Sequence, residues 1–260
     1  MKRGLCVGIN QYLQPGNDLR GCRNDAFDMA AFFEIELGIP RENIVILLDR
    51  SATKANVVAE LESMRAKSEP EDYMAYAQSS HGTQQWDMDG DEPDLYDEAL
   101  CFHDTMALGE GWHLDTIMLD DERQKFCASL QEGVRFEAWL DACHSGDGLR
   151  RMGLSYDRAR LMLPRGGLSV PRLRRLGYGI STNPNVVLWT GCAADQLSAD
   201  AYIDGKWCGA FTNAFLHTYG EVGRGLILAR MRTRLRNSGY NQVPQLETVN
   251  PDNLDMLVGQ

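Results

Sequence analysis

The sequence predicts an α/β fold in which helices cover both faces of a mostly parallel central sheet. Short apolar runs, typical of buried strands, alternate along the chain with longer stretches whose apolar residues recur at helical spacing. Strands joined through helices run parallel, and a parallel sheet needs cover on both faces. The 260 residues are 43% hydrophobic, which is enough for a sizeable core in one large domain or two small ones.

Each predicted strand is a short apolar run, and several predicted helices have a recognisable start or stop. The helix over 22–37 ends before a Gly-Ile-Pro segment, which cannot continue it. Ser51 or Thr53 can cap the helix over 54–67, and two acids at the start of the helix over 120–130 favour its dipole. The central strands are predicted at residues 4–10, 43–49, 72–82, 134–142 and 185–193, a further short strand at 98–104, and closing helices at 209–222 and 226–237.

Charge and cysteine content exclude several classes of protein. The net charge of −11 disfavours a nucleic-acid partner, which usually meets a basic surface. No apolar stretch approaches the roughly 18 residues of a membrane-spanning helix, and the N-terminus turns polar too soon for a signal peptide. Seven scattered cysteines without a CxxC pair argue against a zinc ribbon. We therefore expect a cytoplasmic protein with mostly buried thiols and no membrane partner.

Two predicted strands end in unusual turns, SSHG after the third and DACHSG after the fourth. In such sheets the chemistry gathers beyond the carboxyl ends of the strands. Cys143 needs a base to become a nucleophilic thiolate. His144 is a poor partner because neighbours in an extended segment point to opposite sides, whereas His81 can face Cys143 across the sheet edge. Gly82 and Gly146 leave backbone N–H groups open to a substrate carbonyl.

The same residues also have a plainer interpretation. His81 could be a hydrogen-bonded structural histidine and Cys143 a buried thiol. Asp141 lies two residues before Cys143, so its carboxylate is expected on the same face of the strand. Its alternative role is to cap the end of the strand.

Several separated motifs occur in the order found in one family. They are LRGCRNDA, SSHGTQ, DMDGDEPDLYDEAL, LDACHSG, GCAADQLSAD and GAFTNAF. The chain resembles the metacaspases, of the caspase-like clan of cysteine peptidases, over most of residues 4–217. The resemblance implies a caspase-like fold, with Cys143 as nucleophile and His81 as general base. It also implies an oxyanion site formed by the backbone N–H groups of Gly82 and Cys143.

The resemblance further implies one caspase-like domain in three parts. These are a large-subunit-like region (1–148), an arginine-rich linker (149–183) and a small-subunit-like region (184–260). The chemistry needs no cofactor. No prodomain is visible, so we expect regulation from the chain's own loops, from calcium or from a separate regulatory protein, and a monomer by analogy.

A substrate pocket is expected beside the nucleophile. To Asp141 the resemblance adds Cys22, Asp25 and Ser79. Two carboxylates in a small pocket favour a cationic guest, either arginine as a bidentate partner or lysine as a point charge. We therefore expect protein or peptide substrates with Arg or Lys, not Asp, before the scissile bond. Asp25 could alternatively serve only as a helix-start residue.

Residues 150–175 hold eight arginines and one acid, Asp157, and predict a long loop between the fourth and fifth strands. We interpret it as a self-cleavage site or an occluding segment, because the predicted specificity is for arginine. The alternative is a solvated basic loop. The candidate cleavage residues are Arg150, Arg151, Arg158, Arg160, Arg165, Arg172, Arg174 and Arg175.

Residues 87–98 hold seven acids in twelve positions, which repel one another unless a cation or water intervenes. An EF-hand is a poor match, since a glutamate stands where that loop needs glycine. Resemblance to calcium-activated metacaspases implies a calcium site elsewhere, formed by Asp97, Asp120 and Asp121. Arg150 replaces an acid that those members carry, although Asp147 could substitute, so calcium binding and a solvated acidic loop both stay open.

Three rival functions are weighed against a cysteine peptidase. A catalytically silent caspase-like module is disfavoured by the paired His81 and Cys143, and labelling of Cys143 by a covalent inhibitor would decide. A nucleotide binder is disfavoured because no GxGxxG or GxxxxGK[ST] follows the first strand. A metal hydrolase using Cys101, His103, Cys143 and His144 has the spacing of neither a zinc finger nor HExxH.

Overall fold

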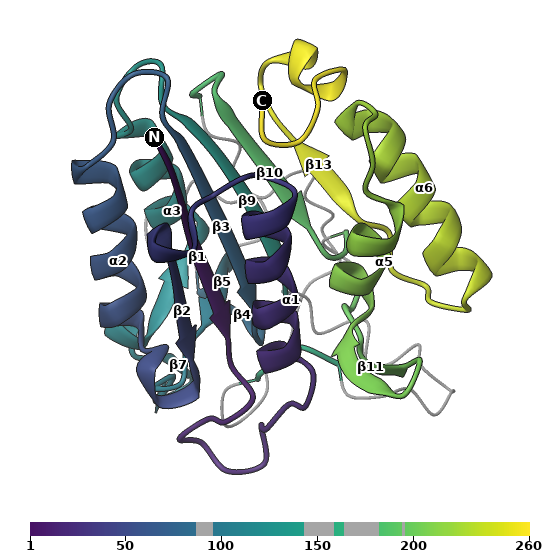
Figure 1. Ribbon diagram of the computed structural model, residues 1–260. Coiled ribbons are helices and arrows are strands. Elements are labelled where there is room, and N and C mark those ends of the chain that lie inside the picture. The colour runs from purple at the N-terminus through teal and green to yellow at the C-terminus, as the bar shows by residue number, and fades with distance from the viewer. Residues whose placement is uncertain (87–95, 143–158, 164–181, 194–195) are drawn as a thin grey trace.

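The computed structural model describes residues 1–86, 96–142, 159–163, 182–193 and 196–260. These residues form a central sheet of six strands with helices on both faces (Figure 1). The strands lie in the order β13 (Gln245–Glu247), β10 (Val186–Thr190), β9 (Arg135–Asp141), β3 (Tyr73–Ser79), β1 (Lys2–Gly8) and β2 (Ile44–Leu48). All neighbouring pairs are parallel except β10 and β13. The predicted α/β fold with a mostly parallel sheet is confirmed.

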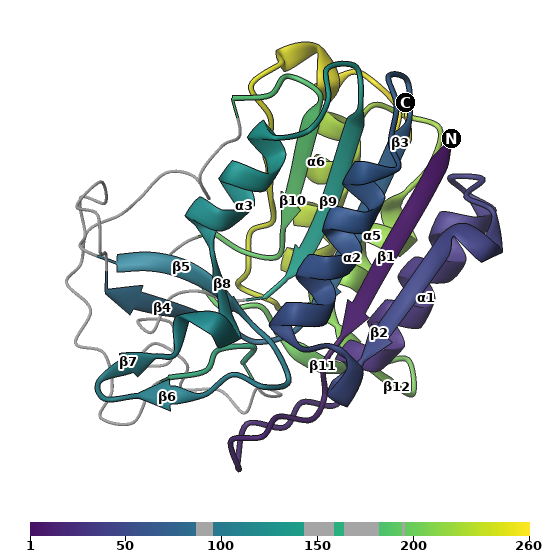
Figure 2. The ribbon, with the colours of Figure 1, turned by 90° about the vertical axis from the view of Figure 1, so that its left-hand side faces the viewer.

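The helices divide between the two faces of the sheet. One face carries α1 (Cys22–Ile35), α5 (Ala210–Thr218) and α6 (Arg224–Asn237), and the other carries α2 (Lys54–Ala66) and α3 (Asp120–Ala128), as Figure 2 shows. Because successive side chains of a strand point to opposite faces, the sheet contributes side chains to two separate cores. On β9, Phe136 and Ala138 pack with α2 and α3, whereas Trp139 packs with α1 and α5.

A buried carboxylate, that of Glu137 on β9, lies in the core between the sheet and helices α1, α5 and α6. Glu137 accepts hydrogen bonds from Tyr73 Oη at 2.7 Å and Trp189 Nε1 at 2.8 Å. Arg224, at the start of α6, donates to it through Nε at 2.9 Å and Nη2 at 2.8 Å. One guanidinium thus balances one carboxylate, and the pair ties α6 to the middle of the sheet.

Smaller sheets lie beside the carboxyl ends of the central strands. β4 (Gly82–Trp86), β5 (Tyr96–Cys101) and β8 (Ile117–Leu119) form an antiparallel sheet. β6 (Ala107–Leu108) pairs with β7 (Gly111–Trp112), and β11 (Asp200–Ile203) pairs with β12 (Lys206–Gly209). Short 3-10 helices cover Arg41–Asn43, Asp49–Ser51, Leu114–Thr116 and Pro251–Leu254. Among the described residues, no helix has the length and apolar character needed to cross a bilayer.

The strand predicted within 72–82, which was expected to end in a turn, is found as β3, and a second strand follows the turn. β3 ends at Ser79, and β4 begins at Gly82 and pairs with β5 instead of with the central sheet. The chain leaves the sheet between them, where the His81 N–H donates to Tyr12 Oη at 2.7 Å. His81 is therefore held at the turn just beyond the carboxyl end of β3, where parallel sheets gather their chemistry.

Candidate active site

The register of the sheet aligns the two unusual strand ends. β3 and β9 are neighbours, and Ser79 pairs with Asp141 in the last position of their ladder. His81 follows two residues after Ser79, and Cys143 follows two residues after Asp141 in the sequence. Cys143 itself, with His144, Gly146 and Asp147, lies outside the described residues, so the distance between His81 and Cys143 stays a prediction.

The His81 ring is buried and held in one tautomer. Its Nε2 lies 2.7 Å from the carbonyl oxygen of Asn17. A carbonyl oxygen only accepts, so Nε2 carries the proton and the lone pair is on Nδ1. Nδ1 is buried and has no hydrogen-bond partner among the described residues. Burial lowers the pKa of His81 to about 4, so the ring is a neutral base at physiological pH.

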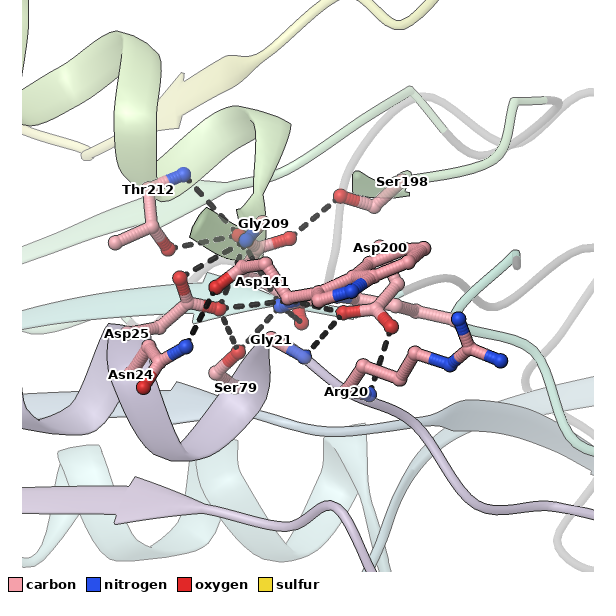
Figure 3. Close-up of polar contacts among 12 residues, drawn as sticks. Arg20, Gly21, Asn24, Asp25, Ser79, Asp141, Ser198, Asp200, Gly209 and Thr212 are labelled. Atoms are coloured by element: carbon pink, nitrogen blue, oxygen red, sulfur yellow. Dashed lines mark hydrogen bonds and ion pairs between the residues drawn. The ribbon is translucent and has the colours of Figure 1, made fainter. Parts of the chain in front are cut away.

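Three carboxylates converge on one buried point beside this turn (Figure 3). Asp25 comes from the first turn of α1, Asp141 from the end of β9 and Asp200 from the start of β11. Asp25 is 1% exposed, Asp141 1% and Asp200 0%. With Ser79 they form what we call the carboxylate pocket. Such a concentration of buried negative charge is unfavourable unless a cation fills it.

The cation is Arg160, which is 0% exposed. Its Nη2 lies 2.7 Å from Asp25 Oδ2 and 3.1 Å from Asp200 Oδ1, and its Nη1 lies 3.2 Å from Asp141 Oδ2. Nη1 also donates to Ser79 Oγ. Although burial acts to lower the pKa of Arg160, these carboxylates hold it well above its ordinary value. The guanidinium therefore stays charged in the pocket.

Each carboxylate of the pocket is oriented by further donors. Asp25 accepts from Ser79 Oγ at 2.6 Å and from the Gly209 N–H at 2.9 Å. Asp141 accepts from Ser198 Oγ at 2.5 Å and Thr212 Oγ1 at 2.7 Å.

Asp200 is held by backbone donors. It accepts from the N–H groups of Arg20 and Gly21, both at 2.8 Å. Gly21 admits this approach because a Cβ there would lie 2.6 Å from Asp200 Oδ1. The carboxylates are thus fixed in place with their charge directed at the guest.

Burial also raises the pKa of two groups in the pocket. It raises the pKa of Asp25 to about 6, although the Arg160 guanidinium opposes this shift. It raises the pKa of the Cys22 thiol as well. Cys22 is 0% exposed, is the first residue of α1, and lies close enough to Arg160, Asp25 and Asp200 to interact with their charges. A protonated thiol there lines the pocket without adding charge.

The residues predicted to line the substrate pocket lie near one another, and two further residues join them. Asp25, Ser79 and Asp141 contact Arg160, and Cys22 is buried at the start of α1. Asp200 and Ser198 were missed. Both lie in the GCAADQLSAD motif, which pointed to the family but carried no assigned role. The predicted oxyanion donor Gly82 directs its N–H at the carbonyl oxygen of Arg160, at 2.9 Å.

Of the eight candidate cleavage residues, Arg160 is within the described residues. It is not the solvated side chain of the alternative interpretation, because it is fully buried. The other seven lie outside the described part of the chain, and they are Arg150, Arg151, Arg158, Arg165, Arg172, Arg174 and Arg175.

The predicted calcium ligands lie on adjoining segments, Asp97 in β5 and Asp120 with Asp121 at the start of α3. Asp97 and Asp120 are buried, and Asp121 pairs with Lys125 at 2.9 Å. Within the described ranges, no group of three or more His, Cys, Asp or Glu side chains is placed to hold a metal ion. The acids at 87–95 are not among the residues described.

The fold and the buried pocket beside a strand-end histidine define a class, the caspase-like cysteine peptidases. The family model described as "Metacaspase, peptidase C14 domain" matches residues 2–151. The chain belongs to this family and is a cysteine-type endopeptidase, which acts on protein or peptide substrates and needs no cofactor for its chemistry.

Similar proteins agree with this assignment. The chain is 30% identical to Metacaspase-1A of Aspergillus oryzae, over 96% of the chain and 68% of that protein. It is 30% identical to Metacaspase-1 of Emericella nidulans, over 98% of the chain and 72% of that protein.

Solved structures show the same fold. Protein GSU0716 from Geobacter sulfurreducens aligns with a TM-score of 0.73 and 23% identity, over 100% of this chain and 98% of that one. Caspase-1 from Spodoptera frugiperda aligns with a TM-score of 0.57 and 12% identity, over 99% and 89%. The predicted caspase-like fold and the resemblance to metacaspases are confirmed.

Proposed function

We propose that this peptidase cleaves after arginine, and more slowly after lysine, with Cys143 as nucleophile and His81 as its base. The observation that carries the proposal is the carboxylate pocket, in which Asp25, Asp141 and Asp200 bind the guanidinium of Arg160. A substrate arginine would make the same contacts.

The pocket favours arginine over lysine because the two terminal nitrogens of the guanidinium contact different pocket residues. Nη2 of Arg160 contacts Asp25 and Asp200, while Nη1 contacts Asp141 and Ser79. A planar guanidinium can serve both sets at once. A single ammonium lacks the second donor group. An aspartate would add a fourth buried carboxylate and is rejected on charge alone.

The chemistry follows from the state of His81. A neutral imidazole with a free Nδ1 lone pair can take the thiol proton as Cys143 attacks the substrate carbonyl. The Gly82 N–H would donate to the oxyanion, together with the Cys143 N–H that the family resemblance implies. His81 then gives the proton to the leaving amine, and water hydrolyses the thioester to free the acid and the thiol.

Turnover of fluorogenic peptides with Arg, Lys or Asp before the scissile bond tests the proposal. We expect turnover in the order Arg, Lys, Asp, and its loss in Cys143→Ala. The matched control is Cys127→Ser, which alters another buried thiol, on α3, and should keep the activity. Full activity in Cys143→Ala, or preference for Asp, would refute the proposal.

Four further predictions accompany this function. Calcium activation through Asp97, Asp120 and Asp121, control by a regulatory protein, a cytoplasmic location and the three-part division at 148 and 183 all await tests. Running the same peptide assay with and without a chelator tests the first, because activity unchanged by chelation would remove the calcium requirement. Labelling of Cys143 by an arginine-directed covalent inhibitor separates the enzyme from a silent module.

A further inference from the structure

We propose that the cavity between α2, α3 and the central sheet is a binding site for a free amphipathic carboxylic acid, with Arg123 as the partner of its carboxylate. The inference goes beyond the proposed function and does not depend on it. Three features of the described residues carry it, namely the size of the cavity, its apolar lining and the buried positive charge beside it.

The cavity lies on the face of the sheet that carries α2 and α3 (Figure 2). Residues of both helices line it, and residues of β3, β9 and β10 form its floor. Its volume is about 460 Å³, which is within the usual range for small-molecule sites. At about 30 Å³ for each water-sized group it has room for roughly fifteen such groups, which is enough for a medium-chain fatty acid.

The lining is mostly apolar. Phe136, Ala138 and Leu140 occupy alternate positions of β9 and face the cavity. Val58 of α2 and Leu188 of β10 also line it and are half-buried. Apolar side chains that stay accessible inside a concave site favour an apolar guest, because its entry removes both surfaces from water.

Arg123 on α3 indicates that this guest carries an acid group. Its side chain lines the same cavity. Nη1 donates to the Met118 carbonyl at 3.2 Å, whereas Nε and Nη2 are buried without a hydrogen-bond partner among the described residues. Buried donors of a charged group are unfavourable while they lack a partner, and a carboxylate is their strongest partner.

The guanidinium of Arg123 lies between its own helix and the floor of the cavity. Burial raises the pKa of the Tyr76 hydroxyl on β3 and of the Cys127 thiol on α3, and the charge of Arg123 opposes both shifts. Both of these side chains line the cavity. The charge also acts on the Asp120 carboxylate, but Arg123 forms no ion pair with any residue that the structure describes.

The other cations of the described lining are paired with carboxylates. Arg65 pairs with Glu62 at 2.6 Å, and Lys125 pairs with Asp121 at 2.9 Å. Arg123 is therefore the cation of this lining that can take a new anion. A neutral apolar ligand would leave its nitrogens unpaired, and a cationic ligand would be repelled.

The cavity and the carboxylate pocket lie on opposite faces of β9. Leu140 lines the cavity, whereas Asp141, the next residue, accepts from Thr212 Oγ1 on α5. The bound acid is therefore not a substrate, and its binding should not need the catalytic residues.

Calorimetric titration of the full-length chain with decanoate tests the site, and we expect one molecule bound per chain. Arg123→Gln should weaken binding about tenfold or more, because it removes a charge-assisted contact. The matched control is Lys125→Gln, which removes one positive charge from the same helix and should bind as wild type does. Decanol, which has the same chain without the acid, should bind wild type and Arg123→Gln equally.

A second variant tests the apolar part of the site. Ala138→Leu fills the floor of the cavity without changing its charge, and it should also weaken decanoate binding about tenfold or more. Thermal unfolding checks that both variants fold. Arg123→Gln should fold as wild type does, because it removes a buried charge that has no ion-pair partner among the described residues.

The outcomes separate this inference from the proposed function, which peptide turnover decides. No binding of decanoate by wild type, several molecules bound per chain, or wild-type affinity in Arg123→Gln or in Ala138→Leu would overturn the inference and leave the proposed function standing. Cys143→Ala should bind decanoate normally. Loss of binding in that variant would place the acid at the nucleophile and would overturn the inference as well.

Discussion

Within the part of the chain that the structure describes, two arginine–carboxylate clusters are buried, and they differ in charge balance. Arg224 meets the single carboxylate of Glu137, whose remaining acceptor sites are taken by Tyr73 and Trp189. Arg160 meets three carboxylates. The first cluster is neutral and internally satisfied, as a structural pair must be. The second is over-supplied with negative charge, which is the mark of a site built to receive a cation.

The clusters also differ in where their arginines come from. Arg224 opens the packed helix α6. Arg160 lies in the short segment 159–163. In this segment Leu161 forms a bridge with Gly82, and Ala159 forms a bridge with Ala199. Removing a partner from the first cluster should therefore affect folding, and removing one from the second should affect substrate selection.

The largest effect is expected at the structural pair. Glu137→Gln would leave the buried Arg224 without a counter-charge, and it should lower the free energy of unfolding by about 3–5 kcal/mol. Chemical denaturation measures this loss. The ratio of Arg to Lys peptide turnover in the folded variant should stay unchanged. A loss of under about 1 kcal/mol would show that the pair is not what holds α6.

The next effect concerns the pocket. Asp141→Ala removes a carboxylate that contacts the guest guanidinium, and kcat/KM for an arginine peptide should fall about 100-fold. The control is Glu62→Ala, a half-buried partner of Arg65 on α2, which should keep its activity. Equal activities of the two variants would remove Asp141 from the pocket's function.

A smaller effect separates the two cations. Lysine offers one donor group where arginine offers two, so kcat/KM for the lysine peptide should be about tenfold lower. Asp200→Asn should narrow this gap, because it weakens one of the contacts that arginine gains. Equal turnover of both peptides by wild type would contradict the divided contacts of Nη1 and Nη2.

The smallest effect is on pH dependence. Because burial raises the pKa of Asp25 to about 6, Asp25 loses its charge as the pH falls through that value. Arginine-peptide kcat/KM should therefore decline severalfold below about pH 6, well above the pKa of His81 near 4.

The pH dependence of stability that Asp25 causes has the opposite sign to the pH dependence of activity. A raised acid pKa means that the contribution of Asp25 to stability is fully present below its ordinary value near 3.8 and is lost as the pH rises through about 6. Asp25→Asn should remove both dependences. An activity decline near pH 6 that persists in Asp25→Asn would assign it to another group.

Much of the fold could be predicted from the sequence because hydrophobic runs carry the signal. The strands at 43–49 and 134–142 and the helix at 54–67 are found within one or two residues of their predicted bounds. The structure selects Thr53 as the cap, accepting from the Asn56 N–H at 3.2 Å. The edge strand β13 was missed since three half-buried residues give no pattern.

The site was predictable where a motif marks it and not where the fold completes it. Asp25, Ser79, His81 and Asp141 lie in recognisable sequence motifs. Asp200 reaches the pocket only because the start of β11 lies against the backbone of Arg20 and Gly21, just before α1, a contact that no local pattern encodes. Likewise the eight linker arginines look alike in sequence, and only tertiary contacts distinguish Arg160.

The most direct test of the proposed arginine-specific cysteine peptidase is covalent labelling by an arginyl chloromethyl ketone. Peptide mapping then identifies the labelled residue. The chain should be modified at Cys143. Modification should be lost in Asp141→Ala, and an aspartyl reagent should leave the chain unmodified. If the label is found on another cysteine, or if the aspartyl reagent reacts as readily, the pocket of Asp25, Asp141 and Asp200 does not select the substrate for this nucleophile.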